Sequence, residues 1–312
     1  MIDKNFPIDK NMRLDFMPPE YRQHFQAYPH TYYMEPFCVE GNLYFIGNKE
    51  IACYLIDSGE GLIIIDTGYD FCAGQFFNSI WSLGYNPKDV KMIFHTHNHN
   101  DHIASTNLLV QLSGATTYMS EADGKAMVEA MTATGEDAKQ YRAIGNRALL
   151  FVPDVYTRDG DEFTLGNVTV KCVDTPGHSR GCQSFFFNVT GRDGKQYIAA
   201  IHGGVGINTL HKEMLELMQY PTARDEFFGH IERIVDWPVD IYLSSHTFQN
   251  YTEEKLRSRA ENPDAPNPFI DPTEWKRILT TAWIMGHELI DDEASGNADE
   301  RKKAIYPFLL NK

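Results

Sequence analysis

Four histidines and one aspartate lie within eight residues of this 312-residue chain: His95, His97, His99, Asp101 and His102. Imidazole nitrogens and carboxylate oxygens are ligands that suit zinc. Alternate residues of an extended segment project to the same side, so His97 and His99 can hold one ion. Asp101 and His102 fall where the chain must turn into a helix, and they can face a second ion.

The flanking sequence argues against two simpler interpretations. A solvated histidine-rich loop is not expected between a buried strand, predicted over 90–94, and a helix, predicted over 106–112. A structural zinc site typically uses four ligands, often cysteines, whereas this segment offers more ligands and no cysteine. The segment therefore predicts a functional metal centre.

From His97 onward the segment resembles the His-x-His-x-Asp-His signature of the metallo-β-lactamase superfamily. Three more segments match that family in chain order: Ile-Ile-Asp-Thr-Gly at 64–68, Thr-Pro-Gly-His-Ser at 175–179 and Ser-Ser-His at 244–246. The resemblance implies two zinc ions, each with three protein ligands. One ion would be bound by His97, His99 and His178, and the other by Asp101, His102 and His246.

The resemblance also implies the fold. It predicts an α/β protein built as an αββα sandwich, in which two mixed β-sheets are flanked by helices and the metals lie at one edge between the sheets. We expect a single domain over 1–312. Within it, 1–33 would be an N-terminal arm, 34–260 the catalytic core and 261–312 a C-terminal helical extension.

Hydrophobic patterning predicts the elements themselves. Strands are expected over 43–46, 52–56, 62–65, 90–94, 116–119, 168–173, 184–189, 197–201 and 239–243. Helices are expected over 76–83, 106–112, 121–150, 222–234 and 273–290. Asp-Pro-Thr-Glu at 271–274 has the pattern of a helix N-cap, a proline at the first helical position and a glutamate at the third.

Within the superfamily the sequence resembles the third subclass of metallo-β-lactamases and related hydrolases, at 35–37, 41–44, 120–123 and 267–271. Many superfamily hydrolases have a metal-bridging aspartate after the third histidine, where this chain has Ile201-His202-Gly203-Gly204. The difference argues against the glyoxalase and homoserine-lactonase pattern and is compatible with the third subclass. That subclass often binds the substrate carboxylate through serines just after this point, so the glycines put β-lactam recognition in doubt.

Three further polar residues near the motifs each have two interpretations. His202 is either an additional metal ligand or a strand-end histidine beside the site. His95 has the spacing of a ligand, but only the register from His97 ends in Asp-His, so we expect a packing or ligand-supporting role. Asp66 either orients a metal ligand or caps a turn.

The expected activity is hydrolysis of a small cyclic amide or ester, with a β-lactam as the named candidate. Zinc makes hydroxide available at neutral pH, and this hydroxide would attack the carbonyl carbon. Asp101 would ligate the second zinc and orient the nucleophile. The alternatives are a cytosolic lactonase or thioesterase on the same fold, or a di-iron redox protein of the superfamily, although that redox class usually has a glutamate in the first motif and a flavin domain.

Composition limits the partners. A formal net charge of −15 and a pI near 5.2 disfavour nucleic acid, because phosphate binding needs clustered Lys and Arg. No membrane-helix pattern and no signal peptide are visible, so the expected compartment is the cytoplasm. The five cysteines form no Cys-x-x-Cys pair and are expected to be unpaired, mostly buried residues. The oligomeric state stays open.

Overall fold

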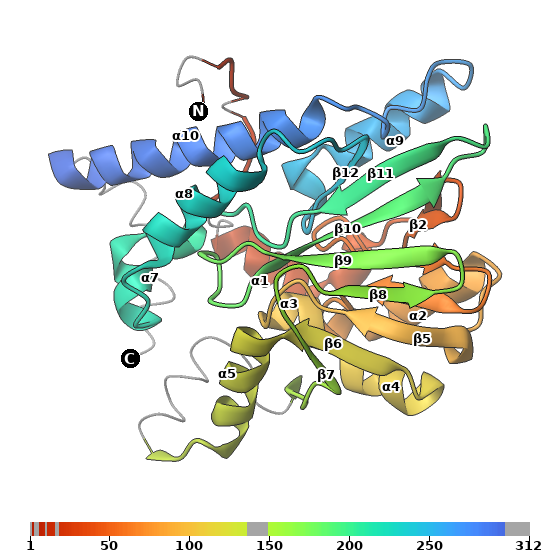
Figure 1. Cartoon of the computed structure of the whole chain (residues 1–312), viewed down its shortest axis with the longest axis horizontal. Coiled ribbons are helices and arrows are strands. Elements are labelled where there is room, and N and C mark those ends of the chain that lie inside the picture. Colours follow the sequence, from red (N-terminus) through yellow and green to blue (C-terminus); the bar gives the residue numbers. More distant parts are fainter. Residues whose placement is uncertain (1, 3–5, 10, 16–18, 136–148, 297–312) are drawn as a thin grey trace.

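Two β-sheets face each other in the computed structural model, which describes residues 2, 6–9, 11–15, 19–135 and 149–296 (Figure 1). The seven-stranded sheet follows the chain order β1 (Phe37–Glu40), β2 (Leu43–Phe45), β3 (Tyr54–Asp57), β4 (Leu62–Ile65), β5 (Val90–Phe94), β6 (Thr116–Ser120) and β7 (Val155–Thr157). The five-stranded sheet has the order β12 (Ile241–Leu243), β11 (Gln196–Ile201), β10 (Gln183–Thr190), β9 (Val168–Asp174) and β8 (Glu162–Leu165).

Both sheets are mixed. In the larger sheet β1 to β4 pair antiparallel, whereas β4 to β7 pair parallel. In the smaller sheet β8 to β11 pair antiparallel, and β11 pairs parallel with β12. Parallel strands end at the same edge, so the loops after β5, β11 and β12 can carry side chains that converge.

The main apolar core lies between the two sheets. Phe94 of β5 stacks on Tyr118 of β6, with ring centroids 4.5 Å apart, and meets Phe185 of β10 at 5.4 Å. Along β4, Ile63 and Ile65 face this core, whereas Leu62 and Ile64 face the outer helices. Strand β4 is therefore buried on both sides, as its continuous apolar run indicates.

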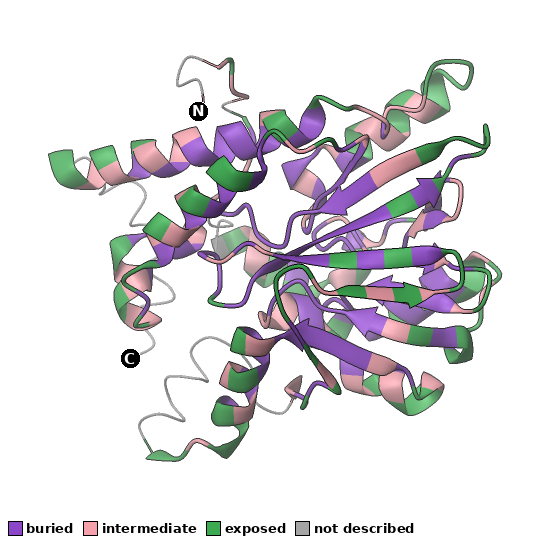
Figure 2. Ribbon diagram, in the orientation of Figure 1, coloured by how far each residue is buried: buried purple, intermediate pink, exposed green. Residues whose placement is uncertain are grey.

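Helices cover both outer faces. α2 (Ala73–Ser82) and α4 (Thr106–Ser113) pack on the seven-stranded sheet, and α8 (Ala223–Ile234) and α10 (Glu274–Ser295) pack on the five-stranded sheet. Trp275 of α10 is buried, and its indole N–H donates to the carbonyl oxygen of Ile234 at 2.9 Å. Figure 2 shows the buried stripes that these helices turn towards the sheets. The predicted αββα arrangement is confirmed.

The other helices of the described residues are α1 (Pro19–Ala27), α3 (Asn100–Ile103), α5 (Glu121–Thr132), α7 (Lys212–Leu217) and α9 (Thr252–Glu261). Short 3₁₀ turns lie at Pro29–Tyr32, Asp70–Cys72, Pro87–Asp89, Asn208–Leu210 and Thr247–Gln249. Within the described ranges no helix combines the length and apolar character that crossing a membrane requires. The five cysteines all fall in these ranges, and none forms a disulfide.

Several predicted boundaries differ from the structure. Residues 1–33 were expected to be irregular, but they contain α1, whose Phe25 is buried against aromatic rings that include Tyr32. The helix expected over 121–150 ends at Thr132 as α5, and 136–148 lie outside the described residues. β1, β7, β8 and α9 were not predicted, because short elements with alternating or polar composition give a weak periodic signal.

The N-cap of the last helix was predicted two residues too early, at Asp271. The N-cap in the structure is Thr273. Its hydroxyl donates to the Asp271 carboxylate at 2.7 Å, so the side chain accepts no hydrogen bond from the backbone N–H groups of the first helical turn. Glu274 does not reach back to cap the helix. Its carboxylate is buried and pairs with Lys255 and with Arg277, so a tertiary ion pair replaces the local capping bond.

Candidate metal centre

The predicted ligands meet at the edge where the parallel strands end. The loop after β5 supplies His97 and His99 and leads into α3, which carries Asp101 and His102. The loop between β9 and β10 supplies His178, and His246 follows β12. The position matches the general rule that sites in such sheets lie beyond the carboxyl ends of parallel strands.

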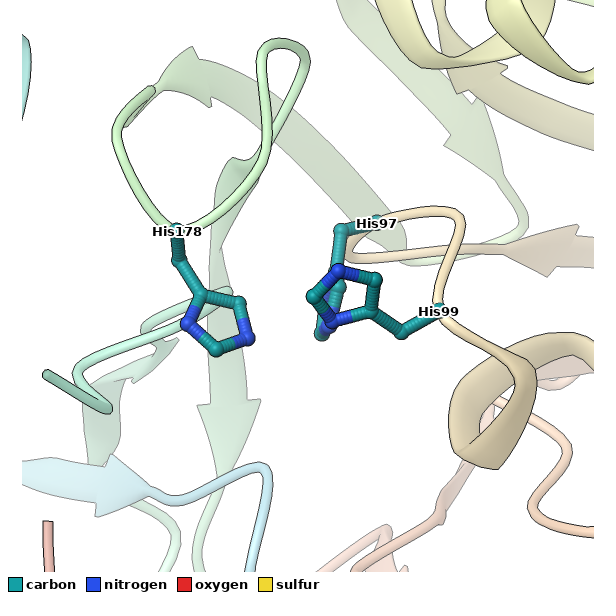
Figure 3. Close-up of side chains that lie close together, drawn as sticks. All are labelled: His97, His99 and His178. Atoms are coloured by element: carbon teal, nitrogen blue, oxygen red, sulfur yellow. The ribbon is translucent and has the colours of Figure 1, made fainter. Parts of the chain in front are cut away.

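His97, His99 and His178 form a first group. One nitrogen of each ring lies within 4.8 Å of the others, and the ring centroids are 4.5 to 4.9 Å apart. Figure 3 shows the three rings turned towards one another from two loops that are distant in sequence. The structure thus brings together three nitrogen atoms that can point at one ion.

Asp101, His102 and His246 form a second group, again with ligand atoms within 4.8 Å of one another. Oδ2 of Asp101 lies 3.4 Å from Nε2 of His102 and 3.7 Å from Nε2 of His246. The two groups adjoin, because the rings of His97 and His102 are 4.2 Å apart. Two ions at these groups would therefore be neighbours.

Hydrogen bonds fix which ring nitrogen is free in the buried histidines. The carboxylate of Asp66 accepts from Nδ1 of His102 at 2.8 Å, so Nε2 of His102 has no proton when the ring is neutral. The Thr96 hydroxyl donates to Asp66 and therefore accepts from Nδ1 of His97 at 3.0 Å. In the neutral form of both rings, Nε2 is therefore an unprotonated nitrogen that faces the site.

His178 and His246 are also protonated at Nδ1 and leave Nε2 free. Nδ1 of His178 lies 3.1 Å from the carbonyl oxygen of Gly206, and Nδ1 of His246 lies 3.2 Å from the carbonyl oxygen of Glu50. A carbonyl oxygen can only accept, so each Nδ1 is protonated and each Nε2 is free.

The free nitrogens provide the test of whether a metal suits this site. Nε2 of His97 and Nε2 of His102 are buried and make no hydrogen bond with any described residue. Buried polar atoms without a partner are rare in folded proteins and require an explanation. A cation at each group would satisfy both nitrogens, and the backing carbonyl and carboxylate groups are the supports that metal-bound histidines typically have. The residues present fit two metal ions.

Burial governs the protonation of these groups. It lowers the pKa of His97 well below its ordinary value, the pKa of His99 to about 3 and the pKa of His178 and His246 to about 4. Burial also acts to lower the pKa of His102, but the two nearby carboxylates outweigh it and raise that pKa to about 10. The second group thus has the stronger attraction for positive charge.

Asp66 supports the second group from an unusual backbone position. It follows β4 with a φ of 59°, a left-handed conformation that few residues other than glycine adopt and that Asp tolerates better than most. Its carboxylate accepts from the backbone N–H and the hydroxyl of Thr96, each at 2.8 Å, and from His102. The backbone turn therefore aims one carboxylate at the loop that carries the ligands.

A second buried carboxylate, Asp123, joins the two loops that form the first group. It accepts from the backbone N–H of Asn98 at 3.0 Å, from the Ser179 hydroxyl at 2.7 Å and from the backbone N–H of Gly181 at 2.7 Å. Burial raises its pKa, and the three bonds act in the opposite direction. Sequence reasoning missed this role, because an aspartate in the first turn of a helix is typical of ordinary capping.

His95 and His202 lie outside both groups. In His95, Nδ1 contacts the Tyr118 carbonyl oxygen at 3.0 Å and Nε2 contacts the Thr106 hydroxyl at 2.8 Å. In His202, Nδ1 accepts from the N–H of Gly204 and Nε2 contacts His230. Both nitrogens of each ring are thus engaged with protein atoms, which leaves none for a metal.

Five of the six residues in the two groups, all except the fully buried His102, line a cavity of about 330 Å³, within the size range of small-molecule sites. Its wall includes Gly203, Gly204 and Gly206, with Arg13 and Arg22 from the N-terminal segment. A Cβ at Gly204 would lie 2.6 Å from the ring of His178, and one at Gly203 would lie 2.2 Å from a carbonyl oxygen. Neither position therefore has space for a side chain, and this part of the cavity wall is formed by backbone atoms.

Comparisons with known proteins agree with this geometry. The family model described as the metallo-β-lactamase superfamily matches residues 47–191. The hydroxyacylglutathione hydrolase of Methylococcus capsulatus is 28% identical over 107 residues, which cover 34% of this chain and 30% of that protein. The hydroxyacylglutathione hydrolase of Francisella tularensis is 25% identical over 228 residues, which cover 69% of this chain and 77% of that protein. The chain thus matches less than a third of the length of the Methylococcus protein.

Solved structures extend the likeness to nearly the whole fold. A subclass B3 metallo-β-lactamase of Bradyrhizobium japonicum has a TM-score of 0.73 and 26% identity, and the match covers 85% of this chain and 97% of that one. The native metallo-β-lactamase of Legionella gormanii has a TM-score of 0.69 and 25% identity, with 86% and 97% covered. The motif order, the αββα sandwich and these matches lead to one conclusion. The chain has the metallo-β-lactamase fold, and its sequence matches the model of the metallo-β-lactamase superfamily over residues 47–191.

Proposed function

We propose that this protein is a zinc-dependent hydrolase that opens a small cyclic amide or ester, with a β-lactam as the first candidate. The observation that carries the proposal is the pair of three-ligand groups, of which all members except His102 line one cavity. The likeness to solved B3 β-lactamases supports the choice of a β-lactam.

The ligand sets would be His97, His99 and His178 for one zinc ion and Asp101, His102 and His246 for the other. Zinc bound there would lower the pKa of a water molecule to about 7 and polarise a substrate carbonyl group. Asp101 has a further role, because its Oδ2 lies within 4 Å of two ring nitrogens and faces the cavity. Its carboxylate would accept a hydrogen bond from the attacking water and orient it.

The glycine wall argues against efficient recognition of a β-lactam carboxylate. Gly203, Gly204 and Gly206 provide no hydroxyl, and packing against His178 leaves no space for a side chain at Gly204. Loss of a hydrogen bond to a charged group costs about 1.5–3 kcal/mol. We therefore expect β-lactam hydrolysis that is measurable but well below about 10⁶ M⁻¹s⁻¹, a value ordinary for efficient enzymes.

A second candidate is hydrolysis of an acyl thioester or a lactone on the same site. The sequence relatives named as hydroxyacylglutathione hydrolases favour the thioester. The position after β11, where many such hydrolases have a bridging aspartate, is occupied in this chain by His202, which is already bonded on both sides. Because of this difference, a thioester is a less favoured candidate substrate than a β-lactam.

One experiment tests the metal and the substrate together. The purified protein is analysed for zinc and iron, then assayed against a chromogenic cephalosporin, a lactone and an acylglutathione, with Asp101→Ala as the inactive control. We expect close to two zinc ions per chain and chelator-sensitive activity. A protein that stays metal-free after zinc incubation would overturn the proposal, and two iron ions would favour the redox alternative.

The substrate panel decides between the candidates. Hydrolysis of the acylglutathione or the lactone without hydrolysis of the cephalosporin would transfer the assignment to the second candidate. In this proposal the substrate is a small molecule and 1–312 form one domain. The cytoplasmic location stays a prediction.

A further inference from the structure

Two more histidines form a buried pair beside the first ligand group. Nε2 of His202, just after β11, lies 3.0 Å from Nε2 of His230 in α8. His202 has no exposed surface and His230 has 5% of its surface exposed. Trp275 of α10 lies against His202, with ring centroids 6.0 Å apart.

The surrounding groups allow only one arrangement of protons on a neutral pair. The backbone N–H of Gly204 points at Nδ1 of His202 at 3.1 Å, so this nitrogen must accept and Nε2 must carry the proton. Nδ1 of His230 faces the carbonyl oxygens of Pro176 at 2.8 Å and Glu226 at 3.1 Å, so it must donate. His202 therefore donates through Nε2 to Nε2 of His230.

A proton added to His230 would make two N–H groups face each other across 3.0 Å. A proton added to Nδ1 of His202 would face the backbone N–H of Gly204 across 3.1 Å. Burial, with the other histidine as a lesser cause for His202, lowers the pKa of His202 well below its ordinary value, and burial lowers that of His230 to about 4. The pair is accordingly neutral and directional at neutral pH.

The series of hydrogen bonds through the two histidines begins at Gly204 and ends at Pro176, and both residues lie near His178. Pro176 is two residues before His178 in the loop between β9 and β10. Gly204 packs against the ring of His178 so closely that a Cβ there would approach it to 2.6 Å. The series of hydrogen bonds from Gly204 through His202 and His230 to Pro176 thus links the backbone before His178 to the backbone beside its ring.

We infer that His202 and His230 are positioning residues that hold His178 in its ligating orientation. The inference rests on the proposed function, because it takes His178 to be a metal ligand. Apolar residues of similar size would fill the same space without fixing the distance between the two backbone segments. Groups that support metal ligands typically contribute 10-fold to 100-fold in metal affinity.

The test is a cobalt(II) titration of the metal-depleted full chain, followed by visible absorption and completed by zinc competition with a chromophoric chelator. His178→Ala identifies which binding step belongs to the first group. We expect His230→Leu to weaken that step roughly 10-fold to 100-fold and to leave the second step unchanged. His230→Asn keeps a donor near Pro176 and should recover part of the loss.

The matched control is Ile234→Ala, which removes a fully buried side chain one turn later in α8. It should lower the stability of the fold without changing cobalt affinity at the first group. An equal loss of affinity in Ile234→Ala and His230→Leu would show general loosening and overturn the inference. If His230→Leu does not fold, His230→Asn carries the same comparison.

A direct readout is the ¹⁵N imidazole spectrum of the wild-type protein. His202 should be protonated at Nε2 and His230 at Nδ1, and the opposite tautomers would overturn the inference. Failure of the proposed metal centre would give a different result, because the wild-type chain would then bind neither cobalt nor zinc. Wild-type binding of two cobalt ions with no change in His230→Leu or His230→Asn would reject the positioning role alone.

Discussion

Oδ2 of Asp66 lies 2.8 Å from Nδ1 of His102, and neither side chain has any exposed surface. The pair connects the end of β4 to α3, the helix that carries Asp101 and His102 of the second ligand group. It also determines the tautomer of the neutral ring, because a carboxylate that accepts at Nδ1 leaves Nε2 of neutral His102 without a proton. A metal needs this unprotonated nitrogen.

Asp66→Asn should therefore weaken metal binding at the second group. Oδ1 of Asp66 accepts from the backbone N–H of Thr96, so an asparagine oxygen is held there and its NH₂ faces His102. His102 would then be protonated at Nε2, towards the metal. We expect a loss of roughly 10-fold to 100-fold in zinc affinity, measured in zinc-buffered solutions. Asp57→Asn, at the end of β3 and bonded to Tyr85, is the matched control and should bind like wild type; full affinity in Asp66→Asn would contradict this account.

The histidine motif was predictable from sequence because its chemistry is local. His97, His99, Asp101 and His102 lie within one strand-to-helix turn, so spacing alone places them on two neighbouring groups. His178 and His246 needed the family resemblance, since a lone histidine in a loop has no local signal. The strands were predictable where both faces are apolar, as in 62–65 and 90–94.

The supporting residues were not predictable, because their partners are distant in the chain. Asp123 accepts from residues 25, 56 and 58 positions away, and His230 contacts a carbonyl oxygen 54 positions away. The segment 120–123 resembles the third subclass, but nothing in the sequence near Asp123 or His230 indicates which groups their side chains contact. Only the packing of α5 and α8 against the ligand loops reveals these contacts.

Asp123→Ala should reduce both stability and metal binding at the first group. It leaves the N–H groups of Asn98 and Gly181 and the hydroxyl of Ser179 without their acceptor, and an unsatisfied buried donor costs about 1–3 kcal/mol. Urea denaturation and cobalt titration measure the two effects. Glu121→Ala, two residues earlier and in exposed ion pairs, should leave stability nearly unchanged, because exposed ion pairs contribute little. Equal effects of the two substitutions would remove the role assigned to Asp123.

Acid should destabilise the protein through His230. Its pKa is lowered by burial to about 4, whereas an unfolded histidine has a pKa near 6.5. Between these two values the unfolded chain binds a proton that the folded chain does not, so stability falls as the pH falls from about 6.5 to about 4. The loss from this residue approaches about 1.4 kcal/mol per pH unit.

Urea denaturation of wild type and His230→Leu at pH 7, 6 and 5 isolates this effect. Leucine does not titrate, so the variant should lose less stability between pH 7 and pH 5 than the wild type does. Ile234→Ala keeps His230 and should retain the wild-type slope. Parallel pH profiles for wild type and His230→Leu would show that the folded and unfolded forms of His230 titrate alike.

The buried ion pair of Glu274 and Lys255 gives the largest expected effect on stability away from the metal centre. The Glu274 side chain has no exposed surface and that of Lys255 has 13%, and burial raises the pKa of the carboxyl group and lowers that of the amine. Glu274→Ala would leave Lys255 buried without its partner. We expect a loss of about 3–5 kcal/mol, the usual cost of breaking such a pair.

Two comparisons separate this pair from a surface contact. Asp236→Ala removes one partner of the exposed ion pair with Lys276 and should cost less than about 1 kcal/mol. The double variant Glu274→Leu with Lys255→Met replaces both buried charges by apolar groups and should recover most of the loss, because the desolvation of the unpaired charge is what makes the single variant costly. Denaturation midpoints measure all three, with zinc content as a check that the metal centre is intact. If the double variant is no more stable than Glu274→Ala, the loss comes from packing around α10, and the argument from an unpaired buried charge is wrong.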